Sequence, residues 1–184
     1  MLFYQFNNAN RTNQNTGNIV KLKPRHFFYA ILVSTIGNQS IAAERGPVTN
    51  LLMPRYVSLK ATEANARRGP SLSHRIDWIF KKKGMPLEIY GEYDNWRRVR
   101  DAEGAGGWIH YSLLSGVRSI VVTSSMADLH RKSNKNSMVL ARIEENYITD
   151  LGKCVKDWCE IDAGKYDGWV KKTDIWGVAP NEVR

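Results

Sequence analysis

The pattern of apolar and polar positions predicts short β-strands separated by turns. Residues 54–60 alternate between apolar and polar side chains, as a half-buried strand does. Residues 77–80 and 86–93 form two more apolar runs, separated by a Lys-Gly turn at 82–84. Asp94 and Asn95 follow, and short Asx side chains favour a tight hairpin turn. No amphipathic helix interrupts these strands, so the pattern predicts an all-β fold of small closed barrels.

This pattern of strands and turns occurs twice along the chain. Trp96 and Trp108, which lie on either side of a Gly-rich turn, correspond to Trp158 and Trp169, 62 and 61 residues later. A repeat of this period indicates two copies of one small domain. We expect the first copy at 44–116 and the second at 117–180. No Pro- or Ser-rich linker separates them, which predicts tight packing or even an exchange of strands between the copies.

A family resemblance rests on several motifs in order. They are N-A-R-x-G-P at 65–70, D-N-W-R-R-V-R at 94–100, G-W-I-H-Y-S-L-L-S-G at 107–116 and W-G-V at 176–178. With these motifs the chain resembles bacterial SH3-like domains over residues 55–178, most closely a paired, exported alphaproteobacterial type. The resemblance implies two tandem, strongly bent barrels of five to six strands. It also implies binding rather than catalysis, often to peptidoglycan or peptides at the cell envelope.

The second copy departs from this pattern. Residues 127–133 match the first motif only loosely, because its Asn, Gly and Pro are missing. The resemblance therefore does not imply that both copies bind the same ligand.

The first 43 residues have the order of a leader followed by a secretory signal peptide. A basic cluster at 21–26 precedes about ten mostly apolar residues at 27–36, and small residues follow at 39–43. The apolar run is shorter than the roughly 20 residues that span a bilayer. We expect cleavage after Ala42 or Ala43 and export to the periplasm or envelope, with no transmembrane span in the mature chain. An uncleaved anchor or a buried apolar segment is the alternative.

The basic cluster begins far from Met1. A translation start near Val20 would explain this distance.

The net charge of +9 is unevenly distributed. Residues 54–118 hold 12 basic and 7 acidic side chains, whereas residues 119–184 hold ten of each. A basic first copy favours anionic partners such as nucleic acid, anionic lipid or acidic cell-wall polymers, although a solvated strand surface would look the same. The predicted export argues against nucleic acid.

Cys154 and Cys159 are the only cysteines and lie on either side of a predicted two-residue turn. Such a turn places them opposite each other, roughly 4.5 Å apart at Cα, which suits a disulfide. The small loop predicts about 2 kcal/mol of stabilisation. Free thiols or a redox role remain alternatives, and a zinc site would need further ligands nearby. The equivalent residues of the first copy, Glu92 and Arg97, predict a cross-strand ion pair there instead.

The same turn raises a question of register in the first copy. It places Trp96 and Val99 on opposite faces of their strand, although both faces are partly apolar. Either the strand is buried on both sides or a bulge shifts the register.

No set of catalytic residues is recognisable. His74, His110 and His130 fall in different elements, and the chain has neither a nucleophile motif nor a phosphate-binding loop. We therefore expect no enzymatic activity, no cofactor and no metal.

Binding is expected to rest on aromatic and cationic side chains. By resemblance, Trp96 and Trp158 occupy the position of a groove tryptophan, although Trp96 would suit the core equally well. Trp108 is a possible neighbour in the groove, but it and Trp169 would also suit the core. Aromatic rings pack on sugars or extended peptides, and guanidinium groups match carboxylates and phosphates. The candidate binding residues are Trp96, Trp158, Trp108, Tyr111, Tyr90, Arg97, Arg98 and Arg100.

The expected function is non-catalytic binding of a cell-wall polymer, a peptide or a protein at the envelope. A structural or assembly protein that acts through contacts between a barrel and another protein is the alternative. The oligomeric state, the ligand and the orientation of the barrels stay open.

Overall fold

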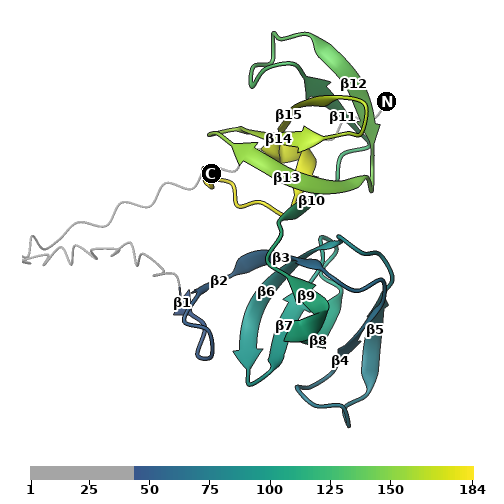
Figure 1. The fold of residues 1–184 in the computed structure, drawn as a ribbon, viewed down its shortest axis with the longest axis vertical. Helices are drawn as coiled ribbons and strands as arrows, with labels where there is room; N and C mark the ends of the chain where they lie inside the picture. The colour runs from purple at the N-terminus through teal and green to yellow at the C-terminus, as the bar shows by residue number, and fades with distance from the viewer. Residues whose placement is uncertain (1–43) are drawn as a thin grey trace, which may run out of the picture. The chain divides into compact units, whose positions relative to one another are not determined.

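The structure, a computed structural model, describes residues 44–184 as two seven-stranded sheets and one two-stranded hairpin (Figure 1). The predicted leader and signal peptide at 1–43 lie outside the described residues. The regular elements of the described part are strands and two short 3-10 helices, which confirms the all-β prediction. None of its helices has the length and hydropathy needed to cross a membrane.

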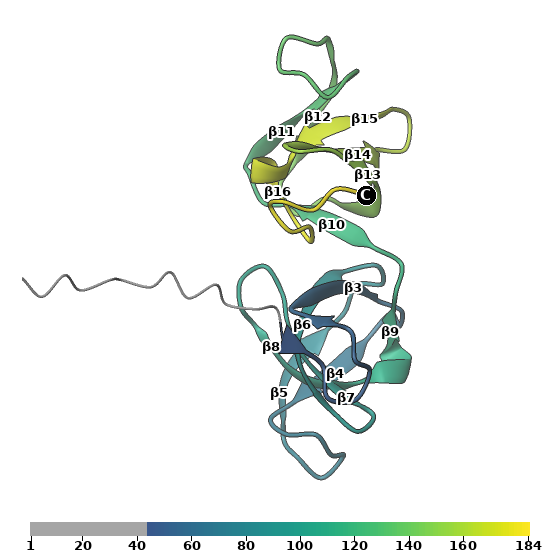
Figure 2. The ribbon, with the colours of Figure 1, turned by 90° about the vertical axis from the view of Figure 1, so that its left-hand side faces the viewer.

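The first seven-stranded sheet contains consecutive strands of the first copy. They are β3 (Arg55–Leu59), β4 (Ala64–Arg67), β5 (Ile76–Phe80), β6 (Pro86–Tyr93), β7 (Trp96–Arg100), β8 (Gly106–His110) and, after the 3-10 helix Tyr111–Leu113, β9 (Leu114–Ser115). Their order across the sheet is β5-β4-β8-β7-β6-β3-β9, and the sheet curls on itself (Figure 2). The hairpin of β1 (Glu44–Arg45) and β2 (Leu52–Met53) precedes it.

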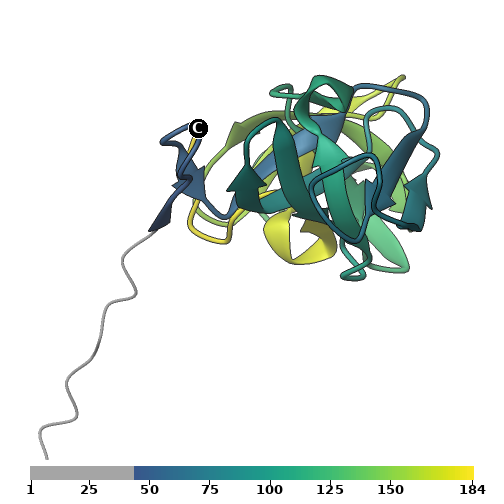
Figure 3. The same cartoon turned by 90° about the horizontal axis from the view of Figure 1, so that it is seen from below.

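The second seven-stranded sheet repeats this arrangement. Its strands are β10 (Ser119–Val122), β11 (Met126–His130), β12 (Val139–Glu144), β13 (Ile148–Cys154), β14 (Trp158–Asp162), β15 (Asp167–Lys171) and, after the 3-10 helix Lys172–Asp174, β16 (Ile175–Trp176). The order β12-β11-β15-β14-β13-β10-β16 matches the first sheet strand for strand. The curled strands of the copies are also seen in Figure 3. Each sheet uses consecutive residues, so no strand in 44–184 is exchanged between the copies.

The register confirms the matching hairpins. Asp94 and Asn95 form the turn between β6 and β7, where Asp94 has a φ of 45°. Lys156 lies in the corresponding turn between β13 and β14. A bulge between Ile89 and Gly91 shifts the pairing, so that Ile89 faces Val99 in the core. The bulge was one of the two solutions left open by the sequence.

Each copy has its own apolar core. Val99 and Ile109 are fully buried in the first copy, and the equivalent residues Ile161 and Val170 are buried in the second. Phe80 fills a position that Ile143 takes in the second copy, as the pairing with Ala64 and Ala127 shows. Trp108 and Trp169 belong to neither core cluster, so the alternative that placed them there is wrong.

Close packing of the strands requires the glycine before each of these tryptophans. A Cβ on Gly107 would lie 2.6 Å from the carbonyl oxygen of Arg67, and one on Gly168 would lie 2.7 Å from that of His130. Only glycine lets β8 and β15 approach the neighbouring strand so closely. The repeated Gly-Trp motif therefore marks the same close approach of strands in both barrels.

Candidate functional site: two tryptophan grooves

The first groove lies between the β4–β5 hairpin and the start of β7. Trp96 is 9% exposed and forms part of its wall. The groove measures about 160 Å³, and its lining residues are Glu63, Ala64, Asn65, Arg67, Leu72, Trp96, His110 and Leu113. The ring of His110 packs edge-on against Trp96, with centroids 5.6 Å apart. Tyr111, 51% exposed, lies beside His110 at 5.0 Å between centroids and extends the aromatic rim.

The second groove lies at the equivalent place, between the β11–β12 loop and the start of β14. Trp158 is 8% exposed. The groove is larger, about 450 Å³, and its lining residues are Ser133, Asn134, Lys135, Asp157, Trp158, Lys171 and Thr173. The Lys171 ammonium group lies 5.9 Å from the centre of the Trp158 ring, within the range of a cation–π contact.

One histidine and one cation accompany each groove tryptophan, at exchanged positions. In the first copy His110 faces Trp96 across the strands, and Arg67 lies on β4. In the second copy Lys171 faces Trp158 in this way. The histidine is His130 on β11, which packs edge-on against Trp158 at 5.0 Å. The two grooves therefore share an aromatic centre but place positive charge on different sides of it.

Four of the predicted binding residues lie on the outer face of the first sheet instead. The guanidinium groups of Arg98 and Arg100 lie 5.1 and 5.3 Å from the centre of the Tyr90 ring. Trp108 pairs with Arg98 across the strands, and Arg100 also forms an ion pair with Glu88. The hydrogen bond that Arg100 donates to this carboxylate raises the pKa of Arg100. The exposed part of this face therefore presents a tyrosine and two arginines.

Arg97 belongs to neither surface, because it is buried in an ionic cluster. Its exposed fraction is 7%, and its Nη1 atom donates to the carbonyl oxygens of Asp94 and Trp96. Its Nε atom lies 3.6 Å from Glu92, which also accepts hydrogen bonds from Arg55 and Thr49. Arg97 is thus committed to the fold and is not free to hold a ligand.

Glu92 is ionised in this cluster although its side chain is fully buried. Burial alone would raise its pKa, but the hydrogen bonds outweigh that effect and lower the pKa to about 2. The donors are the side chain and backbone N–H of Thr49, the Arg55 guanidinium and the backbone N–H of Val48. The predicted ion pair between Glu92 and Arg97 is therefore confirmed, within a larger network that ties residues 46–51 to the first barrel.

The equivalent position of the second barrel holds the predicted disulfide. Cys154 and Cys159 are paired across β13 and β14, with Cα atoms 4.1 Å apart, and are bonded through their sulfurs. The end of the chain covers this bond, since the N–H and C=O groups of Cys154 and Arg184 exchange two hydrogen bonds of 3.1 Å.

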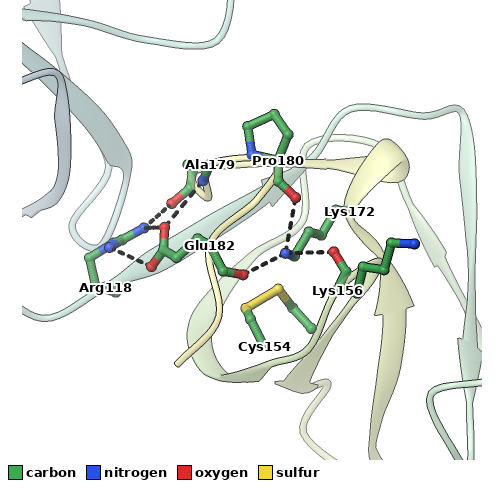
Figure 4. The surroundings of a disulfide bond; sticks show 9 residues. Arg118, Cys154, Lys156, Lys172, Ala179, Pro180 and Glu182 are labelled. Carbon is green, nitrogen blue, oxygen red and sulfur yellow. Dashed lines mark hydrogen bonds and ion pairs between the residues drawn. A yellow bond between two sulfur atoms is a disulfide. The ribbon is translucent and has the colours of Figure 1, made fainter. Parts of the chain in front are cut away.

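The end of the chain is also fixed by two side chains, as Figure 4 shows. Lys172 donates to the carbonyl oxygens of Lys156, Pro180 and Glu182. Arg118 forms a bidentate pair with the Glu182 carboxylate, at 3.0 and 3.1 Å. These contacts hold the last residues against the second barrel.

The sequence identified the centre of each groove but not the side chains around it. His110 is part of the G-W-I-H motif, so its cross-strand position was open to prediction from the hairpin register. Leu72 and Lys135 come from hairpin loops, and their approach to the tryptophans has no local sequence signal. Within residues 44–184 no three metal-ligating side chains come together.

The comparison with protein families agrees with this architecture. The model of the bacterial SH3 domain matches the chain twice, at residues 60–116 and 124–177. Similar solved structures include NlpC2 from Trichomonas vaginalis (13% identity, TM-score 0.32, 67% of this chain and 48% of that one). NlpC1 from the same organism matches at 13% identity and a TM-score of 0.32, over 74% of this chain and 49% of that one.

The matches span about half the length of those two structures. No curated protein matches the chain. The two family matches cover more than half of the chain, with one match in each barrel. The chain therefore belongs to the bacterial SH3 domain family and carries two copies of the domain in tandem.

Proposed function

We propose that this protein is an exported, non-catalytic binding module that recognises peptidoglycan or an exposed peptide at the bacterial envelope through its two tryptophan grooves. Bacterial SH3 domains are binding modules, often in cell-wall proteins. The observation that carries the proposal is the occurrence of a tryptophan-centred groove at the same place in both barrels.

The chemistry of the grooves suits the repeating parts of peptidoglycan. The apolar faces of sugar rings pack on aromatic side chains whose polar edge stays in water. The carboxylates of stem peptides suit the cations beside the tryptophans, which are Arg67 in the first groove and Lys135 and Lys171 in the second. The second groove measures about 450 Å³, within the usual range of roughly 300–1,000 Å³ for small-ligand sites. It therefore takes a larger part of the ligand than the first groove does.

Co-sedimentation with purified sacculi tests the proposal. The wild-type protein is expected to sediment with sacculi, whereas Trp96→Ala and Trp158→Ala each weaken binding and the double variant loses it. Trp78→Ala is the matched control, because Trp78 is 46% exposed on β5 and lines neither groove. Equal retention of the wild type and the double variant would contradict the proposal.

A second assay separates binding from catalysis. Dye-labelled sacculi incubated with the protein are expected to release no dye above the buffer level. Release by the wild type but not by a groove variant would show that the grooves are catalytic.

A further inference from the structure

Equivalent positions on the outer faces of the two barrels carry opposite charges. Val99 pairs with Gly107 in the first barrel, and Ile161 pairs with Gly168 in the second, so the two registers correspond residue by residue. One residue before these core positions, Arg98 corresponds to Glu160. One residue after them, Arg100 corresponds to Asp162.

The neighbouring strands add an acidic residue to the second barrel alone at one position and to both barrels at another. Gly106, opposite Arg100, corresponds to Asp167, opposite Asp162. Glu88, one residue before Ile89, corresponds to Asp150, one residue before Leu151. We call the first surface the arginine face; it consists of Tyr90, Arg98, Arg100 and Trp108. We call the second the carboxylate face; it consists of Asp150, Glu160, Asp162 and Asp167.

The carboxylate face is hollowed. Its four acidic side chains line a depression of about 290 Å³, together with Leu151, Gly152 and Ile161. The carboxylates do not form a metal site, because no three metal-ligating side chains of residues 44–184 come close enough together. A depression with dispersed negative charge fits several separate cationic groups better than one compact ion.

The arginine face supplies groups of this kind. Arg98 is exposed, and its guanidinium lies over Tyr90 without an ion-pair partner among the described residues. None of the ion pairs formed within residues 44–184 involves a side chain of the carboxylate face. Planar guanidinium forks bind carboxylates in a bidentate manner, and the two faces are complementary in charge.

We propose that the arginine face of one chain docks onto the carboxylate face of a second copy of the same chain. Trp108 and Trp169, half-buried beside the charges, supply the apolar centre that protein interfaces need. If the contact is made reciprocally, it closes a dimer. If it is made in one direction only, it produces longer assemblies. The docked residues lie next to the grooves, since Trp108 pairs with Arg67 of the first groove and Trp169 pairs with His130 beside Trp158.

Salt dependence is the first test. Sedimentation velocity of the full chain is expected to show association at about 0.01 M salt and monomers at about 1 M, since the Debye length falls from roughly 30 to 3 Å. A chain that is monomeric at both salt concentrations would overturn the proposal. Retention of such a monomer on a polyanion resin, with loss of retention in Arg98→Glu, would show that the arginine face serves an anionic polymer instead.

Charge reversal is the second test, and it controls for folding. Arg98→Glu places a carboxylate against the carboxylate face, and Glu160→Arg places a guanidinium group against the arginine face. Each variant alone is therefore expected to associate at least about tenfold more weakly. A mixture of the two variants, and the chain with both changes, are expected to regain association. Lys60→Glu, an exposed charge reversal away from both faces, is the control for net charge. Failure of both the mixture and the double variant to associate would contradict the pairing.

Discussion

The two barrels share one fold but stabilise the same hairpin by different interactions. Across the hairpin of the first barrel lie Glu92 and Arg97, which belong to a buried ionic cluster. At the same positions of the second barrel lie Cys154 and Cys159, which form a disulfide. In both copies a chain segment outside the seven strands is attached at this point: residues 46–51 in the first and the last residues in the second.

The two barrels thus hold the same point of the hairpin together by different kinds of bond. A carboxylate can bind several backbone and side-chain donors at once, so Glu92 also fixes residues 48 and 49. A disulfide has no such capacity, and the second barrel fixes its terminal segment through backbone bonds to Cys154 and through Arg118 and Lys172. The first barrel should therefore respond to pH and the second to redox conditions.

The largest effect is expected from Glu92→Ala. This change leaves Arg55 and Arg97 without their carboxylate in a buried setting, which costs about 3–5 kcal/mol of unfolding free energy. Chemical denaturation measures the loss. Hydrogen exchange at the amides of Val48 and Thr49 should accelerate at the same time. Glu103→Ala, in an exposed turn, is the control, and equal stability of the two variants would contradict the central role of Glu92.

Acid should weaken the first barrel next. Because the folded pKa of Glu92, about 2, lies below its ordinary value of 4.5, its contribution is present above pH 4.5 and is lost as the pH falls towards 2. The loss is on the order of 2–3 kcal/mol. Hydrogen exchange at falling pH should show residues 46–51 opening before the terminal segment of the second barrel. The Glu92→Gln variant should lack this pH dependence.

Reduction of the disulfide should affect the second barrel alone. It removes a constraint on a very small loop, worth about 2 kcal/mol in the unfolded state. Denaturation with and without a reducing agent measures this difference, and the Cys154→Ser/Cys159→Ser variant should match the reduced wild type. A loss of hydrogen-exchange protection in the first barrel under the same reduction would show that the ionic cluster and the disulfide are not independent.

The smallest effect concerns the edge hairpin of the second barrel. Asp128 and Arg142 form an ion pair of 3.3 Å whose side chains are 47% and 73% exposed. Exposed pairs contribute about 0–1 kcal/mol. Arg142→Ala should therefore lower the unfolding free energy much less than Glu92→Ala does. Thermal unfolding of the two variants compares their losses of stability, and losses of similar size would contradict the proposed ranking.

The fold was predictable because its signals are local or repeated. The hairpin turns at Asp94 and Lys156, the Gly-Trp strands and the pairing of Cys154 with Cys159 follow from short stretches of sequence. The bulge after Ile89 was only one of two solutions, because the choice depends on which face of the strand the rest of the barrel buries. Strand alternation alone does not contain that information.

The groove was predictable only at its centre. Trp96 and Trp158 stand in matching motifs, whereas Leu72 and Lys135 reach the grooves through loops whose shape is set by tertiary packing. Arg97 was grouped with the ligand-binding arginines because its buried position depends on Glu92, which is itself held by Thr49, 43 residues away in the chain. Such a network is visible only when distant segments are brought together.

The most direct test of the proposed function is a titration of the isotopically labelled protein with soluble peptidoglycan fragments, followed by NMR at the indole N–H groups. The account predicts that the signals of Trp96 and Trp158 shift with added fragment, while that of the exposed Trp78 stays in place. Shifts confined to Trp78, or no shift at any tryptophan at saturating fragment, would contradict binding in the two grooves.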